Sequence, residues 1–235
     1  MPDINWSKNA TAVIVGPTGF SSFSTARQAE ESTSQALNST STNAVASGNI
    51  RSGGRGGTLY GLRRSYFAFN FTGYTTGTIT NLAFHFTPTT TSTGNLSNRL
   101  AQFEGFGTST NFNNYDSTSW WADISNPLVP YSNAFTINDN TTASSVSLNS
   151  TAINDAQNDS YLQIVLMNAG DYNNLAPITD GTNLSYLNQS SNKTFLRFTY
   201  AAPGYQENVN AITSANLNSV NAIATGNINK VIGVS

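Results

Sequence analysis

Two segments in the first half of the chain place aromatic or aliphatic residues at every second position. In the segment 65–71 phenylalanine occupies every second position from Phe67 to Phe71. In the segment 79–86 Leu82, Phe84 and Phe86 have the same spacing. Successive side chains of a strand point to opposite faces, so each set shares one face. The pattern predicts two half-buried strands, which form the clearest pair in the chain.

Further strands are expected at short segments separated by polar turns. These segments are 100–106, 134–138, 145–148, 161–167 and 194–200. Thr and aromatic residues, which favour strands, are frequent, and 13 Phe, 10 Tyr and 3 Trp supply the large side chains that a core needs. Short strands at this spacing predict an all-β fold, an antiparallel β-sandwich.

Two stretches look irregular. The segment 21–57 is rich in small polar residues and ends in a glycine cluster, which predicts loops around short edge strands and a turn at the glycines. That cluster lacks the spacing of a phosphate-binding loop. The segment 149–156 predicts a single helical turn, capped by Asn149 or Ser150.

A domain boundary is expected at Pro203-Gly204, because no aromatic residue follows Tyr205. We therefore expect a sandwich domain over residues 1–203 and a tail over 204–235. The tail repeats a short pattern, in which Asn216 to Ile223 recurs eleven positions later as Asn227 to Val234. Its apolar mass is too small for a core of its own, so the tail either docks along a partner's strand edge or is a frayed terminus. The apolar positions of the repeat are Leu217, Val220, Ile223, Ile228, Val231 and Val234.

Composition narrows the function classes. A net charge of −2, from ten basic and twelve acidic residues, offers little attraction for a phosphate backbone, so nucleic acid is not an expected partner. The absence of cysteine removes disulfides and thiol chemistry. The chain carries no apolar run long enough for a membrane helix, and its first residues lack the features of a signal peptide, so we expect neither a membrane span nor a secretory leader.

Part of the sequence resembles a known family. The run from Leu62 to Thr72, followed by Gly77 to Leu82, is similar to the opening of the jelly-roll domains known as DNRLRE domains, which are of the carbohydrate-binding-module type. The run from Tyr161 to Tyr200 is similar to their closing half. The resemblance covers roughly residues 10 to 234 and departs at Asn70, where the family usually has Asp. It implies that the fold is an antiparallel jelly-roll β-sandwich with an extended C-terminal tail. It also implies a structural protein of a tailed bacteriophage, since similar domains occur there, often with a C-terminal repeat.

Catalytic groups are scarce in the sequence. The chain has one histidine and no cysteine, and His85 lies on the strand face opposite its neighbouring phenylalanines, which predicts a solvent-facing residue. No Gly-x-Ser-x-Gly motif is present. We therefore expect a protein that is not an enzyme.

Two acidic residues flank a tryptophan pair in the segment 116–123. A stacking aromatic beside carboxylates suits a glycan-binding surface, a glycoside-cleaving subsite or ordinary packing, and the sequence alone leaves all three open. The residues of this candidate glycan site are Asp116, Trp120, Trp121 and Asp123.

The segment 171–183 predicts a loop that is rich in oxygen ligands. Asp171 and Asp180 could bind Ca²⁺, although their spacing does not match an EF-hand loop, and local turn hydrogen bonds explain the same residues without a metal. No other cofactor is expected.

These observations lead to one functional expectation with an alternative. We expect a non-enzymatic virion structural protein, a capsid or tail decoration or accessory protein, made in the host cytoplasm and anchored to other virion proteins through its C-terminal repeats. We expect several copies in a homo-oligomer or larger assembly. The alternative is a glycan-binding adhesin for host-surface polysaccharide or mucus.

Overall fold

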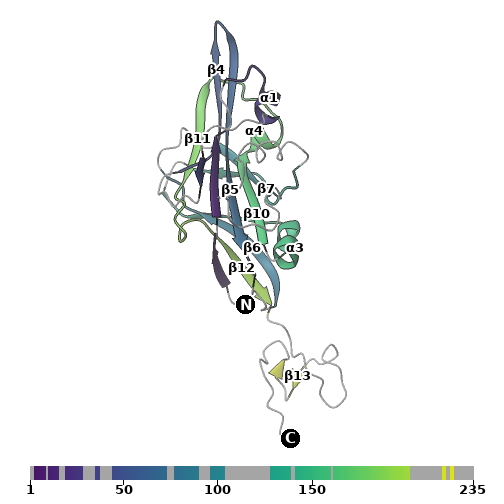
Figure 1. Cartoon of the computed structure of the whole chain (residues 1–235). Coiled ribbons are helices and arrows are strands. Elements are labelled where there is room, and N and C mark those ends of the chain that lie inside the picture. The colour runs from purple at the N-terminus through teal and green to yellow at the C-terminus, as the bar shows by residue number, and fades with distance from the viewer. Residues whose placement is uncertain are drawn as a thin grey trace.

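The computed structural model describes residues 3–8, 10–15, 19–28, 35–37, 44–72, 77–89, 96–103, 128–138, 141–159, 161–201, 219–220 and 223–224. Within them the chain forms two antiparallel sheets that pack together (Figure 1). Strands alternate between the sheets from β5 to β7, and again from β9 to β10 and from β11 to β12, so the chain wraps around a common core as in a jelly roll. The predicted antiparallel β-sandwich is confirmed.

The smaller sheet has four strands in the order β1-β12-β6-β9. Their bounds are Asp3–Ser7 for β1, Thr78–Phe86 for β6, Ser144–Ser147 for β9 and Phe195–Ala201 for β12. Leu82, Phe84 and Phe86 are buried on its inner face, as the alternating pattern predicts. Trp6 of β1 covers the end of this core and donates its indole N–H to the carbonyl of Asn70 at 2.7 Å.

The larger sheet follows the path β11-β4-β5-β10-β7-β8, and β2 pairs with β5 and with β3. Its strands are β2 (Ala10–Val15), β3 (Gln35–Leu37), β4 (Ala44–Gly54), β5 (Gly57–Asn70), β7 (Leu96–Gln102), β8 (Phe135–Ile137), β10 (Tyr161–Asn168) and β11 (Gly181–Leu187). All the further strands predicted from the sequence are present with shifted ends. β11 was not predicted, and it begins inside the segment 171–183.

The two clearest strand patterns belong to different sheets. β5 pairs with β2, β4 and β10, whereas β6 pairs with β12 and β9. Phe67 and Phe84 face each other across the core with ring centroids 5.2 Å apart. The chain therefore crosses from one sheet to the other between β5 and β6. The two strands are a pair in the sense that they face each other across the core, but they do not share hydrogen bonds.

The prediction that β5 is half-buried is wrong. Phe67, Phe69 and Phe71 lie in the core between the sheets, and Tyr66 and Ala68, on the opposite face, are also fully buried. They belong to a second hydrophobic cluster on the outer face of the larger sheet. We call it the outer cluster; its buried members are Phe23, Ala26, Leu62, Tyr66, Ala68, Ala101, Phe103, Val165 and Met167.

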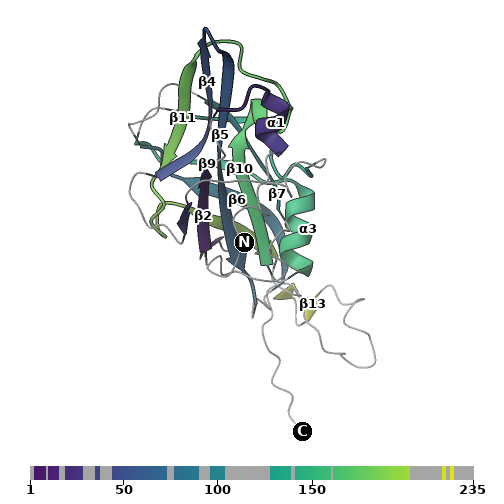
Figure 2. The same cartoon turned by 45° about the horizontal axis from the view of Figure 1, so that its top comes forward.

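Among the described residues, helices α1, α3 and α4 pack on the sheets, and Figure 2 labels α1 and α3. α1 (Phe23–Gln28) packs on β5, and α4 (Ala169–Tyr172) packs on β7 and β10. α3 (Ser150–Asn158) contacts β6 of one sheet and β10 of the other, and it buries Ala152 and Ala156 in the core between them. The expected single turn is in fact a nine-residue helix, because these two alanines give it a buried face.

The reading of the segment 21–57 as loops around short edge strands is wrong for two parts of it. Phe23–Gln28 is a helix, and Ala44–Gly54 is an eleven-residue strand with partners on both sides, β5 and β11. The turn at the glycine cluster is confirmed: Gly54 pairs with Gly57, whose φ of +107° disfavours a side chain. The β4–β5 hairpin projects at the end of the molecule away from the N-terminus (Figure 1).

Candidate functional site

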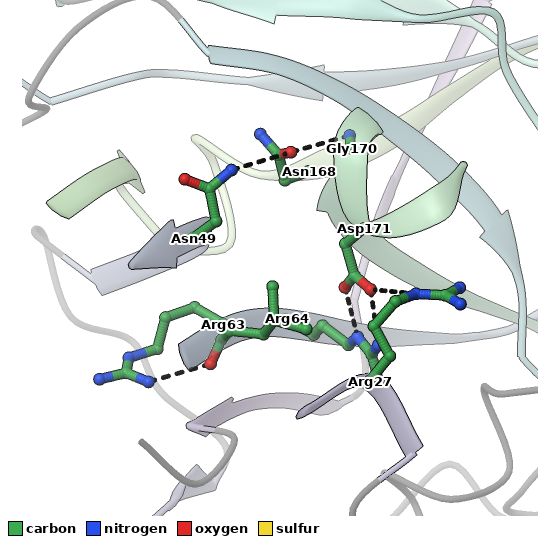
Figure 3. Close-up of polar contacts among 8 residues, drawn as sticks. Arg27, Asn49, Arg63, Arg64, Asn168, Gly170 and Asp171 are labelled. Atoms are coloured by element: carbon green, nitrogen blue, oxygen red, sulfur yellow. Dashed lines mark hydrogen bonds and ion pairs between the residues drawn. The ribbon is translucent and has the colours of Figure 1, made fainter. Parts of the chain in front are cut away.

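A buried ionic cluster joins three elements on the outer face of the larger sheet (Figure 3). Arg64 of β5 donates Nε–H to one oxygen of Asp171 at 2.6 Å and Nη2–H to the other at 2.7 Å. Arg27 of α1 donates its Nε–H to Asp171 at 3.1 Å. Asp171 lies on α4, so one carboxylate holds α1 and α4 to the central strand.

Strand geometry explains why an arginine lies here. Arg64 shares the outer face of β5 with Leu62 and Tyr66, so its side chain points into the outer cluster and is fully buried. Burial by itself lowers the pKa of Arg64, but the charge and hydrogen bonds of Asp171, together with Tyr66, raise it above its ordinary value. The guanidinium is therefore charged, and Asp171 is its required counterion.

A second polar group lies where one strand replaces another beside β5. β2 pairs with residues 63–68 along one edge of β5. The other edge of β5 is shared by two strands: β4 pairs with residues 57–63 and β10 pairs with residues 65–70. β4 must therefore leave β5 where β10 ends. At this exchange Gly48 is essential, because a Cβ there would lie 2.4 Å from the carbonyl oxygen of Asn183.

Asparagine side chains bond the backbone around the strand exchange. Asn168 accepts the N–H of Gly170 at 2.8 Å, which caps α4, and donates to the carbonyl of Ser97 at 3.1 Å. Asn49 of β4 donates to the same Asn168 oxygen at 3.3 Å (Figure 3). Ser47 donates to Asn98 in the same region. This network orients α4 and therefore Asp171.

His85 is partly buried and not simply solvent-facing. Its ring stacks on Phe195 of the neighbouring strand, with centroids 5.0 Å apart and planes 7° apart. Burial, and then the positive charge of Arg197, lowers the pKa of His85 below its ordinary value. The ring therefore packs as a neutral aromatic group at neutral pH.

The residues of the candidate glycan site, Asp116, Trp120, Trp121 and Asp123, lie outside the described residues. The chain that carries them departs from the outer cluster at Phe103 and returns to it at Leu128. Phe103 is buried, with its ring centroid 4.9 Å from that of Tyr66, and the carbonyl of Leu128 accepts the hydroxyl proton of Tyr172 at 3.1 Å. Both ends of this segment are thus fixed on one face.

Both candidate calcium ligands contact arginines. Asp171 is fully buried and bonded to Arg64 and Arg27, and Asp180 forms an ion pair with Arg51 and keeps a side chain that is 54 % exposed. A cation at either carboxylate would have to compete with a guanidinium group. The expected loop is interrupted by β11, which begins at Gly181. A calcium role for these residues stays a prediction.

In the tail the structure describes only two short strands. β13 (Ser219–Val220) and β14 (Ile223–Ala224) pair with each other, with Val220 opposite Ile223. The first copy of the repeat therefore contains a local hairpin. The other apolar repeat positions, Leu217, Ile228, Val231 and Val234, lie outside the described residues.

Two features are absent from the described residues. They contain no group of three or more His, Cys, Asp or Glu side chains that could hold a metal ion. None of their helices has the length and apolar character needed to cross a membrane. Comparison of the whole chain with protein-family models and with curated proteins gives no match.

Sequence reasoning selects Asp171 but misses its partners. Arg64 lies 107 residues away in the sequence and Arg27 lies 144 residues away, so no local pattern joins them. One signal was present: an arginine two positions from both Leu62 and Tyr66 shares their strand face, and a charge on a buried face needs a counterion. Asn49 and Asn168 carry no comparable signal.

Proposed function

We propose that this protein is a non-enzymatic structural component of a tailed-bacteriophage particle, a decoration or accessory protein anchored through residues 204–235. The observation that carries the proposal is the placement of the ends of the sandwich. β1 and β12 are neighbouring strands, and β12 ends at Ala201 on the side of the molecule away from the β4–β5 hairpin (Figure 1). Attachment through the tail would leave the hairpin end exposed.

The ionic cluster and the two hydrophobic clusters also support a display role. They bury a large share of the aromatic residues on both faces of the larger sheet and fix α1 and α4 to it. A rigid body that carries a separate docking segment suits a component present in many copies on an exterior surface. The short apolar repeats suit addition to strand edges of another virion protein.

Truncation tests the anchor. A chain lacking residues 204–235 is expected to keep the far-ultraviolet circular dichroism and melting transition of the sandwich but to be missing from particles assembled in host cells that express it. Incorporation of the truncated chain at the level of the full chain would contradict the proposal.

A matched pair of repeat variants makes the test sharper. Val220→Ser with Val231→Ser removes the central apolar residue of each copy, and Asn218→Ser with Asn229→Ser changes polar residues in the same copies. The first pair is expected to reduce incorporation and the second to leave it unchanged. Equal incorporation of both would exclude apolar docking.

A second candidate function is adhesion to host-surface polysaccharide or mucus through Trp120 and Trp121. It is favoured by the two residues that flank the segment carrying them, because Phe103 and Leu128 both contact the outer cluster and so place the start and the end of that segment on one face of the sheet. Labelled full-length protein should bind host cells, and Trp120→Ala with Trp121→Ala should remove binding while the melting transition is unchanged. Loss of folding in this variant would instead assign the tryptophans to packing.

A further inference from the structure

A pocket of about 240 Å³ lies beside β7, between the segment 130–133 and the junction of β9 with α3. Two apolar residues, Pro130 and Leu148, form part of its wall. The other lining residues carry polar side chains: Arg99, Ser132, Asn133, Ser147 and Asn149. The pocket is smaller and more polar than the usual site for a drug-sized molecule, so it suits a small polar ligand.

Arg99 is the charged residue of this lining. Its guanidinium carbon lies 4.5 Å from the centroid of the Tyr172 ring, and this cation–π contact holds the charged group in place. Its Nε–H is buried and has no hydrogen-bond partner among the residues that the structure describes. A carboxylate matches the fork of N–H groups that a guanidinium presents.

The neighbouring groups suit the rest of a sugar ring. Ser132 accepts the backbone N–H of Leu100 at 3.0 Å, which leaves its own hydroxyl proton for a ligand oxygen. Asn133 and Ser147 are exposed at the mouth of the pocket. Asn149 caps α3, and the N-terminus of a helix favours a nearby negative charge. The pocket thus combines a site for an anion with donors and acceptors for hydroxyl groups.

We propose that this pocket binds a carboxylated monosaccharide unit, a hexuronate, with its carboxylate on Arg99 and its hydroxyls toward Ser132, Asn133 and Ser147. The volume lies below the about 300 Å³ at which pockets for drug-sized molecules begin, so it suits a single sugar ring. The inference rests on the second candidate function, glycan binding, and adds a chemical class and a set of contacting residues to it.

Titration of the isotopically labelled full chain tests the site directly. Glucuronate and galacturonate are expected to shift the amide signals of Ser132, Asn133 and Ser147, whereas glucose and galactose, which lack the carboxylate, leave them unchanged. A disaccharide that ends in a uronate forms a further arm. Shifts with the disaccharide would show that the pocket accepts the end of a polysaccharide, and shifts with the monosaccharide alone would restrict it to free sugar.

Arginine variants separate charge from geometry. Arg99→Gln should abolish the shifts, and Arg99→Lys should weaken binding about tenfold, because lysine keeps the charge but lacks the planar fork. Arg55→Gln makes the same change of charge at the exposed turn of the β4–β5 hairpin and should bind like the unaltered chain. If Arg99→Gln does not fold, the lysine variant carries the comparison.

Three results would overturn the proposal for this pocket. They are no shift of the amide signals with any uronate at tens of millimolar, an equal shift with glucose, or unchanged uronate binding in a folded Arg99→Gln variant. Cell binding distinguishes this failure from failure of the adhesin. Cell binding that depends on the tryptophans, with no uronate shifts, would overturn the pocket and keep adhesion. Uronate shifts without cell binding would support the pocket and count against adhesion.

Discussion

At the scale of single residues, two aspartates with arginine partners differ in their surroundings. Asp171 and both of its arginines are almost completely buried, whereas Asp180 and Arg51 form their ion pair at the surface. Removing the charge of a buried partner leaves the remaining charge without solvation, but removing one partner of an exposed pair leaves a charge that water can solvate. The same substitution should therefore have very different costs at the two positions.

We predict that Asp171→Asn lowers the free energy of unfolding by about 3–5 kcal/mol, because Arg64 and Arg27 keep their charges in the interior. The matched variant Asp180→Asn should cost only about 0–1 kcal/mol. Urea unfolding followed by tyrosine and tryptophan fluorescence measures both. Similar costs for the two variants would show that the buried cluster contributes no more than a surface ion pair.

His85 predicts a dependence of stability on pH. Its folded-state pKa is lowered by burial and by Arg197, so the unfolded chain takes up the proton first as the pH falls below about 6.5. The stability that the neutral ring contributes is present above that pH and is lost as the pH falls toward the folded-state pKa. His85→Phe keeps an aromatic ring for Phe195 but cannot titrate.

The measurement compares the unfolding free energies of the His85→Phe variant and the unaltered chain between about pH 7.5 and pH 5, since other groups that titrate cancel in the difference. We expect the unaltered chain to lose stability relative to the variant as the pH falls. Two curves that stay parallel over this range would rule out the lowered pKa.

At the scale of elements, the start of α3 depends on one side chain. The side-chain oxygen of Asn149 accepts the backbone N–H of Ala152 at 3.1 Å, and the side-chain NH₂ group of Asn149 donates to the backbone carbonyl of Pro130 at 2.5 Å. Asn149 therefore both caps the helix and ties it to the segment beside β7.

We predict that Asn149→Ala lowers the free energy of unfolding by about 1–2 kcal/mol, near the upper end for a helix cap, because the bond to Pro130 is lost as well. Ser150→Ala, at the next and equally exposed position, should change it by less than about 0.5 kcal/mol. Thermal melts of both variants provide the comparison. A larger loss of stability in Ser150→Ala than in Asn149→Ala would show that Ser150, and not Asn149, caps α3.

The sequence predicts elements better than it predicts their neighbours. Alternation along 65–71 and 79–86 correctly identifies two strands and their inward faces, because that pattern is local. Which strands share hydrogen bonds depends on contacts between distant segments, such as Phe195 opposite His85. The long strand β4 and the strand β11 were missed because glycine and asparagine, which disfavour strands, are needed where β4 passes β10.

At the scale of the whole molecule, the two hydrophobic clusters share the same strands. β5, β7 and β10 each contribute to the core between the sheets and to the outer cluster, since alternate residues of one strand point to opposite faces. Leu166 and Met167 are consecutive, both fully buried, and belong to different clusters. Neither face of β10 can lose its packing without disturbing the strand that supports the other.

This arrangement predicts that the sandwich and its outer layer unfold together. Leu166→Ala and Met167→Ala should each lower the free energy of unfolding by about 2–5 kcal/mol and shift one common transition. Far-ultraviolet circular dichroism and tyrosine fluorescence should report the same midpoint in each variant. If Met167→Ala instead produced an early, separate fluorescence transition while the circular dichroism midpoint stayed unchanged, the outer cluster would be an independent layer, and α1 and α4 would detach before the sandwich melts.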